Sequence, residues 1–265
     1  MGSIAYLLIG SRRKIAFKNI SACFPELDAA DCRKINRQQF RYAGQTVFTN
    51  PMNMWLSAKR FRRLVEINGA EEYRHALAEE RNVILLAPHF IAIDVAGLAL
   101  SQERPVISMY QYAKNKLVDV VIKRGRSRYG GVLIERKEPL RKVLRIISKG
   151  DPFYYLPDQD AGRKGIFVPF FHELASTTPA LAKFAAASRA LVIPVRTRIK
   201  PWGQGYEVVL GKPLQDFPSG DEYKDTERMN RQIEKMIRQT PEQYFWVHKR
   251  FKTRPPGEEK FYPFL

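Results

Sequence analysis

A histidine and an aspartate lie five residues apart in the segment Leu85–Asp94, directly after a run of apolar residues. In one regular helix, residues five apart point about 140° away from each other, because each residue turns roughly 100°. His89 and Asp94 therefore meet only if His89 lies in a strand-to-helix turn and Asp94 in the first helical turn. Asp94 would then fix the tautomer of the imidazole, and His89 would remove a proton from a hydroxyl. A structural histidine and an aspartate that complements the helix dipole form the competing interpretation.

A second polar stretch runs from Pro157 to Gly165. Its acidic, amide and cationic side chains are Asp158, Gln159, Asp160, Arg163 and Lys164. Glycines let a ligand approach the backbone closely, and neighbouring cations suit phosphate. Two nearby carboxylates also suit a divalent metal, but no further ligands follow at the spacing of a calcium-binding loop. We therefore expect substrate binding and no metal site, and the Gly-x4-Gly-Lys-Ser/Thr run of a P-loop is absent.

Two further segments carry clustered cations. Arg126 and Arg128 belong to a short arginine-rich segment, and arginine forks match phosphate oxygens bidentately, although a solvated turn explains them as well. Residues 246–256 interleave aromatics with cations. That pattern suits single-stranded nucleic acid or a strip against anionic headgroups. No Gly-x-Ser-x-Gly elbow occurs, so a serine hydrolase lacks its nucleophile.

The elements that must position these residues alternate between strands and helices from Val65 onward. Short runs of branched apolar residues predict strands at 65–67, 82–87, 106–109, 132–134, 153–156, 191–196 and 206–210. Helical periodicity predicts helices at 71–80, 92–100, 115–126, 140–148, 178–188 and 222–239. The alternation predicts an α/β fold with a single, mainly parallel sheet flanked by helices. Because sites collect at the carboxyl ends of such strands, we expect His89 and Asp158 to face one crevice.

The first part of the chain has a helical pattern. We expect residues 1–64 to form a helical, membrane-proximal N-terminal cap and residues 65–265 to form the α/β core of one structural domain. Asp28 is a plausible cap for a helix from Ala29 to Gln45. The apolar run Ile4–Ile9 precedes a basic cluster, which resembles the cytosolic edge of a membrane anchor, and an amphipathic first helix fits equally well. No window of 18 apolar residues occurs, so we expect the anchor to be absent or truncated in this chain.

The charge balance of the chain is unusual. It has 45 Lys and Arg against 27 Asp and Glu, a formal charge of +18 that implies a negatively charged partner. Nucleic acid, anionic lipid and an acidic carrier protein all qualify. No helix-turn-helix, zinc-finger or RNA-recognition signature supports nucleic acid, so we expect no such partner. Cys23 and Cys32 have no histidine near them and predict neither a metal site nor a disulfide framework, which favours a reduced cytosolic compartment.

Taken together, these segments resemble the bacterial lipid A biosynthesis (lauroyl/myristoyl) acyltransferases from about Lys18 to Pro256. His89 and Asp94 match the His-x4-Asp/Glu motif of that family. The other matching blocks are, in order, Asn19–Glu26, Gly125–Arg128, Pro157–Asp160, Val168–Phe171, Ala175–Thr178 and His248–Pro255. Ala161 and Arg163 stand where the family often has Tyr and Pro. That departure leaves open whether Arg163 or Lys164 is the functional cation.

The resemblance implies transfer of a fatty acyl chain from acyl-carrier protein to the hydroxyl of a 3-hydroxyacyl group on a lipid A precursor. His89 would be the general base and Asp94 its orienting partner, with no cofactor beyond the thioester donor. Arg126, Arg128 and the loop from Asp158 to Lys164 would bind the substrates. The implied partners are acyl-carrier protein, a phosphorylated glycolipid and the anionic surface on the cytoplasmic face of the bacterial inner membrane. Another glycolipid, such as a phosphatidylinositol mannoside, is the alternative acceptor, and a nucleic-acid-binding protein is a distant third.

Overall fold

The computed structural model describes residues 2–113, 115–135 and 138–264, apart from the side chains of residues 51–54 and 140. The helices are α1 (Gly2–Leu8), α2 (Gly10–Cys23), α3 (Ala29–Trp55), α4 (Ala58–Leu64), α5 (Glu71–Ala78), α6 (Ile93–Ser101), α7 (Lys116–Arg126), α8 (Leu140–Ile147), α9 (Ala180–Ser188) and α10 (Glu222–Gln239). The strands are β1 (Val65–Asn68), β2 (Val83–Leu86), β3 (Ile107–Tyr110), β4 (Val132–Glu135), β5 (Phe153–Tyr155), β6 (Ile166–Phe170), β7 (Glu173–Thr177), β8 (Leu191–Ile199) and β9 (Tyr206–Leu210). Short 3-10 turns η1 (Gly162–Lys164), η2 (Pro201–Gly203) and η3 (Pro241–Gln243) complete the described elements.

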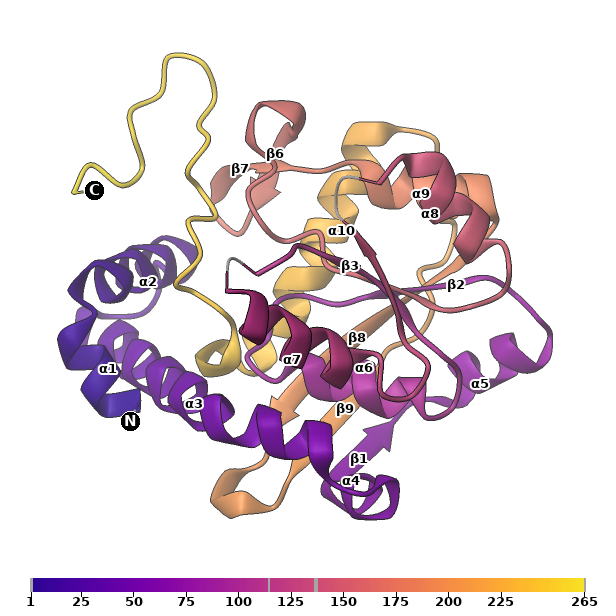
Figure 1. Cartoon of the computed structure of the whole chain (residues 1–265). Coiled ribbons are helices and arrows are strands. Elements are labelled where there is room, and N and C mark those ends of the chain that lie inside the picture. Colours follow the sequence, from indigo (N-terminus) through magenta and orange to yellow (C-terminus); the bar gives the residue numbers. More distant parts are fainter. Residues whose placement is uncertain (1, 114, 136–137, 265) are drawn as a thin grey trace.

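The central sheet has the order β1-β9-β8-β2-β5-β3-β4 among the described strands. Figure 1 labels β1, β9, β8, β2 and β3 of this sheet. Neighbouring strands are parallel except for β8 and β9, which run antiparallel. The expected α/β class with a mainly parallel sheet is therefore confirmed. Strands β6 and β7 form a separate antiparallel hairpin that the sequence pattern did not predict. Pro169 within β6 breaks the usual strand signature, since proline cannot donate to a ladder.

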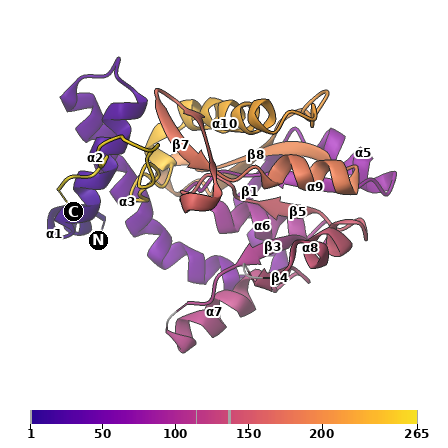
Figure 2. The same cartoon turned by 90° about the horizontal axis from the view of Figure 1, so that it is seen from above.

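Strand β2 shows how the sheet divides the core between its two faces. All four of its residues are buried, as expected for a strand covered on both sides. Ile84 and Leu86 pack in a cluster that includes residues of α8, α9 and α10, whereas Val83 and Leu85 pack with α5 and α6. Figure 2 shows α10 and α7 on opposite sides of the sheet. The alternation fixes the register of β2 and thereby the place where its carboxyl end delivers the chain to His89.

Strands β3 and β5 separate before they end. They pair only through Ile107 with Phe153 and Ser108 with Tyr154, whereas β3 continues beside β4 as far as Tyr110. The carboxyl half of β3 therefore has β4 on one side and no ladder partner in β5 on the other. This divergence leaves room for a cavity at the carboxyl edge of the sheet.

Helix α2 lies beside the segment from Trp246 to Tyr262 and is hydrogen-bonded to it (Figure 1). Nδ2 of Asn19 donates to the backbone oxygens of Trp246 and His248 at 2.7 and 2.8 Å, and Oδ1 of Asn19 accepts from the hydroxyl of Tyr262 at 2.6 Å. Asp28 caps the next helix by accepting from the backbone N–H groups of Ala30 and Asp31, as predicted. That helix, α3, runs beyond the predicted end to Trp55. None of the described helices combines the length and apolarity needed to span a membrane.

Candidate active site

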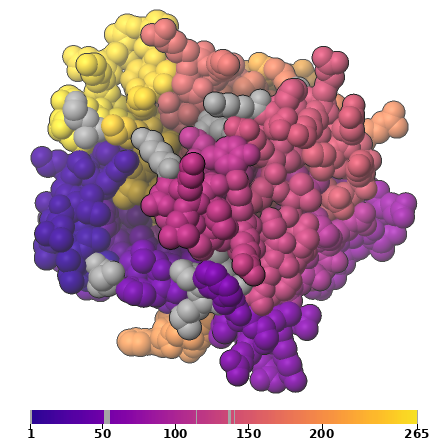
Figure 3. All heavy atoms as spheres, viewed as in Figure 1, coloured from indigo at the N-terminus to yellow at the C-terminus, as the bar shows by residue number. Residues whose placement is uncertain are grey.

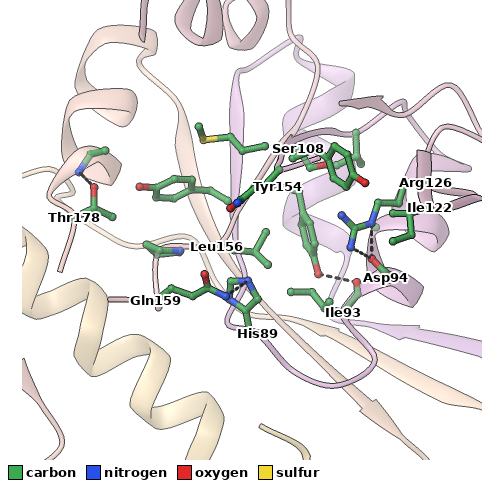
Figure 4. Close-up of a pocket in the computed structure, with 18 of the residues that line it drawn as sticks. His89, Ile93, Asp94, Ser108, Ile122, Arg126, Tyr154, Leu156, Gln159 and Thr178 are labelled. Carbon is green, nitrogen blue, oxygen red and sulfur yellow. Dashed lines mark hydrogen bonds and ion pairs between the residues drawn. The ribbon is translucent and has the colours of Figure 1, made fainter. Parts of the chain in front are cut away.

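A cavity of about 640 Å³ lies at the carboxyl edge of the sheet, where β2, β3 and β5 end (Figure 4). His89 lines it from the turn after β2, and Gln159 and Asp160 line it from the loop after β5. The shared crevice predicted from the order of strands and loops is thus present. Strands β2 and β5 are neighbours in the sheet, which brings their following loops together.

The backbone around His89 is fixed by the segment that follows η3. The N–H of Phe245 donates to the carbonyl of His89 at 3.0 Å, and the N–H of Ile91 donates to the carbonyl of Gln243 at 2.8 Å. The imidazole is partly exposed, with 27% of its side-chain surface accessible. The backbone of His89 is thus fixed, while its ring stays accessible from the cavity.

Asp158 holds the imidazole from the protein side. Nδ1 of His89 donates to Oδ1 of Asp158 at 2.6 Å, and the backbone N–H of His89 donates to Oδ2 at 2.8 Å. The hydroxyl of Tyr244 donates to the same Oδ2 at 2.8 Å. Both oxygens of this fully buried carboxylate are therefore occupied, and the ring has one orientation.

Asp158 remains ionised despite its burial. Burial is the largest influence and raises its pKa, but the charge of His89 in its protonated form and the hydrogen bonds from His89 and Tyr244 outweigh it and lower the pKa of Asp158 to about 2. A carboxylate only accepts hydrogen bonds, so Nδ1 of the imidazole carries a proton. In the neutral ring Nε2 is then the acceptor, and it faces the amide nitrogen of Gln159 at 3.2 Å (Figure 4). This is the tautomer that a general base requires.

Asp94 takes a different place from the one predicted. It lies in the first turn of α6, as expected, but its Oδ1 accepts from Nε of Arg126 and pairs with Nη2, both at 2.8 Å (Figure 4). Both ring nitrogens of His89 meet other partners. The expectation that Asp94 orients the imidazole is therefore wrong in this structure, and Asp158 holds that position. The reason is topological: β5 pairs with β2, so that the loop after β5 brings Asp158 into contact with the imidazole.

The loop after β5 separates its two candidate cations. Both side chains are exposed, but Lys164 lines the cavity and Arg163 does not. The carboxylate of Asp160 is engaged by Thr253, whose N–H and hydroxyl donate at 3.1 and 3.0 Å. Asp160 therefore borders the cavity while it anchors the loop. Within the described residues, no group of three or more histidine, cysteine, aspartate and glutamate side chains is arranged to hold a metal ion.

The two candidate arginines also lie in different places. Arg126 lines the cavity beside His89 and lies 5.6 Å from the ring centre of Tyr110. Arg128 lines a smaller hollow with Trp55 and Arg124, donates to the carbonyl of Leu56 and lies over the ring of Tyr129. Arg128 does not line the cavity of His89, because it follows the end of α7 and contacts the turn between α3 and α4. Its role in substrate binding stays a prediction.

The aromatic and basic segment at the end of the chain is not a surface strip. Trp246, Arg250 and Phe251 are almost fully buried. Arg250 donates to the carbonyl of Ser176 at 2.7 Å and to the hydroxyl of Thr177 at 2.6 Å. The N–H of Asp160 donates to Nε2 of His248 at 3.2 Å, and burial, aided by His89 and Arg250, lowers the pKa of His248 to about 4 against the opposing pull of Asp158 and Asp160. The segment thus supports the loop that carries Asp158.

Comparison with known proteins shows which family the chain belongs to. The family model for bacterial lipid A biosynthesis acyltransferases matches residues 1–253. The chain belongs to this family. As a lipid A biosynthesis acyltransferase, it is an enzyme that transfers an acyl group in lipid A biosynthesis, and a glycolipid acceptor follows from that membership.

Three relatives of this acyltransferase come from Escherichia coli strain K12. A lipid A biosynthesis lauroyltransferase is 33% identical, over 97% of this chain and 84% of the relative. A palmitoleoyltransferase is 32% identical, over 99% and 86%, and a myristoyltransferase is 31% identical, over 97% and 80%. The three are named for different acyl chains yet are almost equally similar to this acyltransferase. Overall identity therefore does not select its acyl chain.

Proposed function

We propose that the protein transfers a fatty acyl chain from acyl-carrier protein to the hydroxyl of a 3-hydroxyacyl group on a lipid A precursor, with His89 as general base and Asp158 as its orienting partner. The observation that carries the proposal is the imidazole itself. Its Nδ1–H is held by a buried carboxylate, its Nε2 meets the amide nitrogen of Gln159, and both residues line a cavity of about 640 Å³. Such a pair suits proton removal from a hydroxyl.

The proposed step is a direct displacement. Nε2 of His89 takes the proton of the acceptor hydroxyl while the hydroxyl oxygen attacks the carbonyl carbon of the donor thioester. A C–O bond to the acceptor forms and the C–S bond of the donor breaks. The imidazolium, stabilised by ionised Asp158, then returns the proton to the leaving thiolate. Proton and charge balance without a covalent enzyme intermediate. A general base of this kind contributes about 10²–10⁴-fold.

The basic residues around the cavity suit both substrates. Arg126 pairs with Asp94, and Lys164 belongs to the loop after β5, so the cavity has cations from two separate segments. Phosphates on the acceptor and the phosphopantetheine of the donor are the groups that such cations bind. The net charge of +18 favours encounter with an acidic carrier protein.

An anionic membrane surface is the proposed setting, on the cytoplasmic face of the inner membrane. Helices α1, α3 and α7 lie along one side of the molecule (Figures 1 and 2). They present exposed apolar side chains, namely Ile4, Leu7, Leu8, Val47, Phe48, Trp55, Leu117, Val118 and Val120. The space-filling view shows α7 on this near face between α1 and the body of the molecule (Figure 3). Because Ile122 and Arg126 on α7 line the cavity, docking through this helix would bring the site to the lipid.

Acyl transfer with purified components tests the proposal. The wild type should acylate a lipid A precursor with acyl-carrier protein as donor, and His89→Ala should lose about 10²–10⁴-fold in kcat. His75→Ala is the matched control, because His75 is an exposed histidine on α5. Undiminished turnover in His89→Ala contradicts the mechanism. Transfer to a phosphatidylinositol mannoside without transfer to lipid A precursors contradicts the proposed acceptor.

A further inference from the structure

The lining of the cavity falls into two groups on opposite faces of the sheet. Ser108 and Tyr154 lie on the face covered by α6 and α7, with Ile122 and Arg126. Met109 and Tyr155 lie on the other face, near α9. In Figure 4, Ser108, Tyr154 and Ile122 are on one side, Thr178 is on the other, and Leu156, Gln159 and His89 lie between them. The cavity thus has an α6–α7 arm and an α9 arm that meet at His89.

One face of α6 forms a wall of the α6–α7 arm. Asp94, Gly97, Leu98 and Ser101 all line the cavity and follow the spacing of one helical face. From Asp94 to Ser101 this wall extends about 10 Å along the helix axis, at 1.5 Å per residue. The arm therefore leads from the reaction centre toward the far end of the helix.

Gly97 is a glycine that neither packing nor backbone conformation requires. A Cβ at this position would meet no atom closer than Cε1 of Tyr154, at 3.9 Å, which is ordinary van der Waals contact. Its φ is outside the positive region that favours glycine. A glycine inside a helix costs about 1 kcal/mol relative to alanine. A methyl group thus fits at position 97 in ordinary contact with Tyr154, and it would take its volume from the cavity that Gly97 lines.

We propose that the α6–α7 arm holds the acyl chain of the donor and that Gly97 sets how long a chain fits. This inference rests on the proposed function. The arm is bounded inward by Val106 and Leu98, which are nearly fully buried, so a methylene chain in the arm exchanges contact with water for apolar contacts. Each arm has one cation, but Arg126 in the α6–α7 arm is neutralised by its ion pair with Asp94. Lys164 at the α9 arm has no acidic partner within 4.0 Å among the described residues, so it suits the phosphorylated acceptor.

The experiment offers the enzyme an equimolar mixture of acyl-carrier protein donors, from decanoyl to palmitoyl, and measures the products by mass spectrometry. Gly97→Ala and Gly97→Leu should shift the product distribution progressively toward shorter chains. Each methylene excluded from the arm should cost about fourfold, the equivalent of roughly 0.8 kcal/mol. Ala187→Leu is the matched control on an exposed helical position of α9, and its distribution should equal that of the wild type.

Two results would overturn the inference. One is an unchanged donor distribution in Gly97→Leu while the variant still turns over. The other is a changed preference for the acyl chains of the acceptor with an unchanged donor preference, which would assign the arm to the acceptor. Loss of all turnover in Gly97→Leu is resolved by Gly97→Ala, which should raise the melting temperature and still shorten the preferred chain. Failure of the wild type to transfer any donor refutes the proposed function instead.

Discussion

Nδ1 of His89 and Oδ1 of Asp158 lie 2.6 Å apart although the two residues are 69 positions apart in sequence. The contact joins the loops after two adjacent strands of the sheet. The carboxylate that holds the imidazole is thus Asp158. Asp94, the aspartate of the His-x4-Asp motif, pairs with Arg126 instead. The two aspartates are therefore expected to differ in what they contribute.

We expect Asp158→Asn to lower kcat by about 10³–10⁴, because an amide in this place no longer stabilises the imidazolium. Asp94→Asn should act mainly on KM, through loss of the ion pair that positions Arg126. Steady-state kinetics with both substrates varied would separate the two effects. Near wild-type kcat in Asp158→Asn, with a large loss in Asp94→Asn, would restore Asp94 as the orienting residue.

We expect Tyr244→Phe to lower kcat roughly tenfold, as for loss of one hydrogen bond to a charged group, about 1.5 kcal/mol. Without the phenol, the carboxylate of Asp158 becomes more basic and favours the imidazolium. The acid limb of the pH profile of kcat/KM should then move to higher pH. A lower rate with an unmoved profile would mean that Tyr244 only supports the fold.

Acid should destabilise the protein through His248. Its pKa is about 4 in the folded chain, below the ordinary value near 6.5, so the unfolded chain binds more protons between these two values. The free energy of unfolding should therefore fall as the pH drops from about 6.5 to 4, by up to about 1.4 kcal/mol per pH unit. Urea titrations should give a shallower dependence for His248→Gln. An equal slope in both proteins would contradict this origin.

Lys164 and Arg163 offer a test with adjacent residues. Lys164→Met should raise KM for the phosphorylated acceptor about tenfold, since one charge-assisted contact is lost. Arg163→Met should leave KM nearly unchanged, because Arg163 does not line the cavity. The reverse order of effects would identify Arg163 as the functional cation.

Membrane docking through α7 predicts that Leu117→Ser with Val120→Ser weakens sedimentation with anionic vesicles by at least about tenfold. Both side chains are exposed, so the fold should persist. Tyr223→Ser removes an exposed aromatic from α10, on the other side of the sheet, and serves as the control (Figure 2). Equal binding of all variants would exclude α7 as the docking element.

The strands of the sheet and the helices between them were largely predictable, because the hydrophobic patterns that predict them lie within short stretches of sequence. The predicted strand at 82–87 and helix at 92–100 correspond closely to β2 and α6. The hairpin of β6 and β7 was missed because Pro169 interrupts its pattern. The division into a cap of residues 1–64 and a core of residues 65–265 stays a prediction.

The site was less predictable, because its contacts are not local. The crevice shared by His89 and the Asp158 loop follows from strand order, but which carboxylate meets the ring depends on β5 lying directly beside β2. Tyr244 carried no signal of its own, since it reaches Asp158 only through folding of the chain end. The aromatic and basic pattern of residues 246–256 suggested a surface, whereas burial of Trp246 and Arg250 is decided by packing against α2 and β7.

The support of the Asp158 loop by Tyr244, His248 and Thr253 has a consequence for synthesis of the protein itself. Proteins leave the ribosome from the N-terminus, so His89 and Asp158 emerge well before Tyr244, His248 and Thr253. The loop obtains its last hydrogen bonds only when residue 253 is free to fold. A nascent chain thus has no finished site with which to consume acyl donors. Competence for acyl transfer therefore arises only after the segment from Tyr244 to Thr253 has been synthesised and has folded onto the loop.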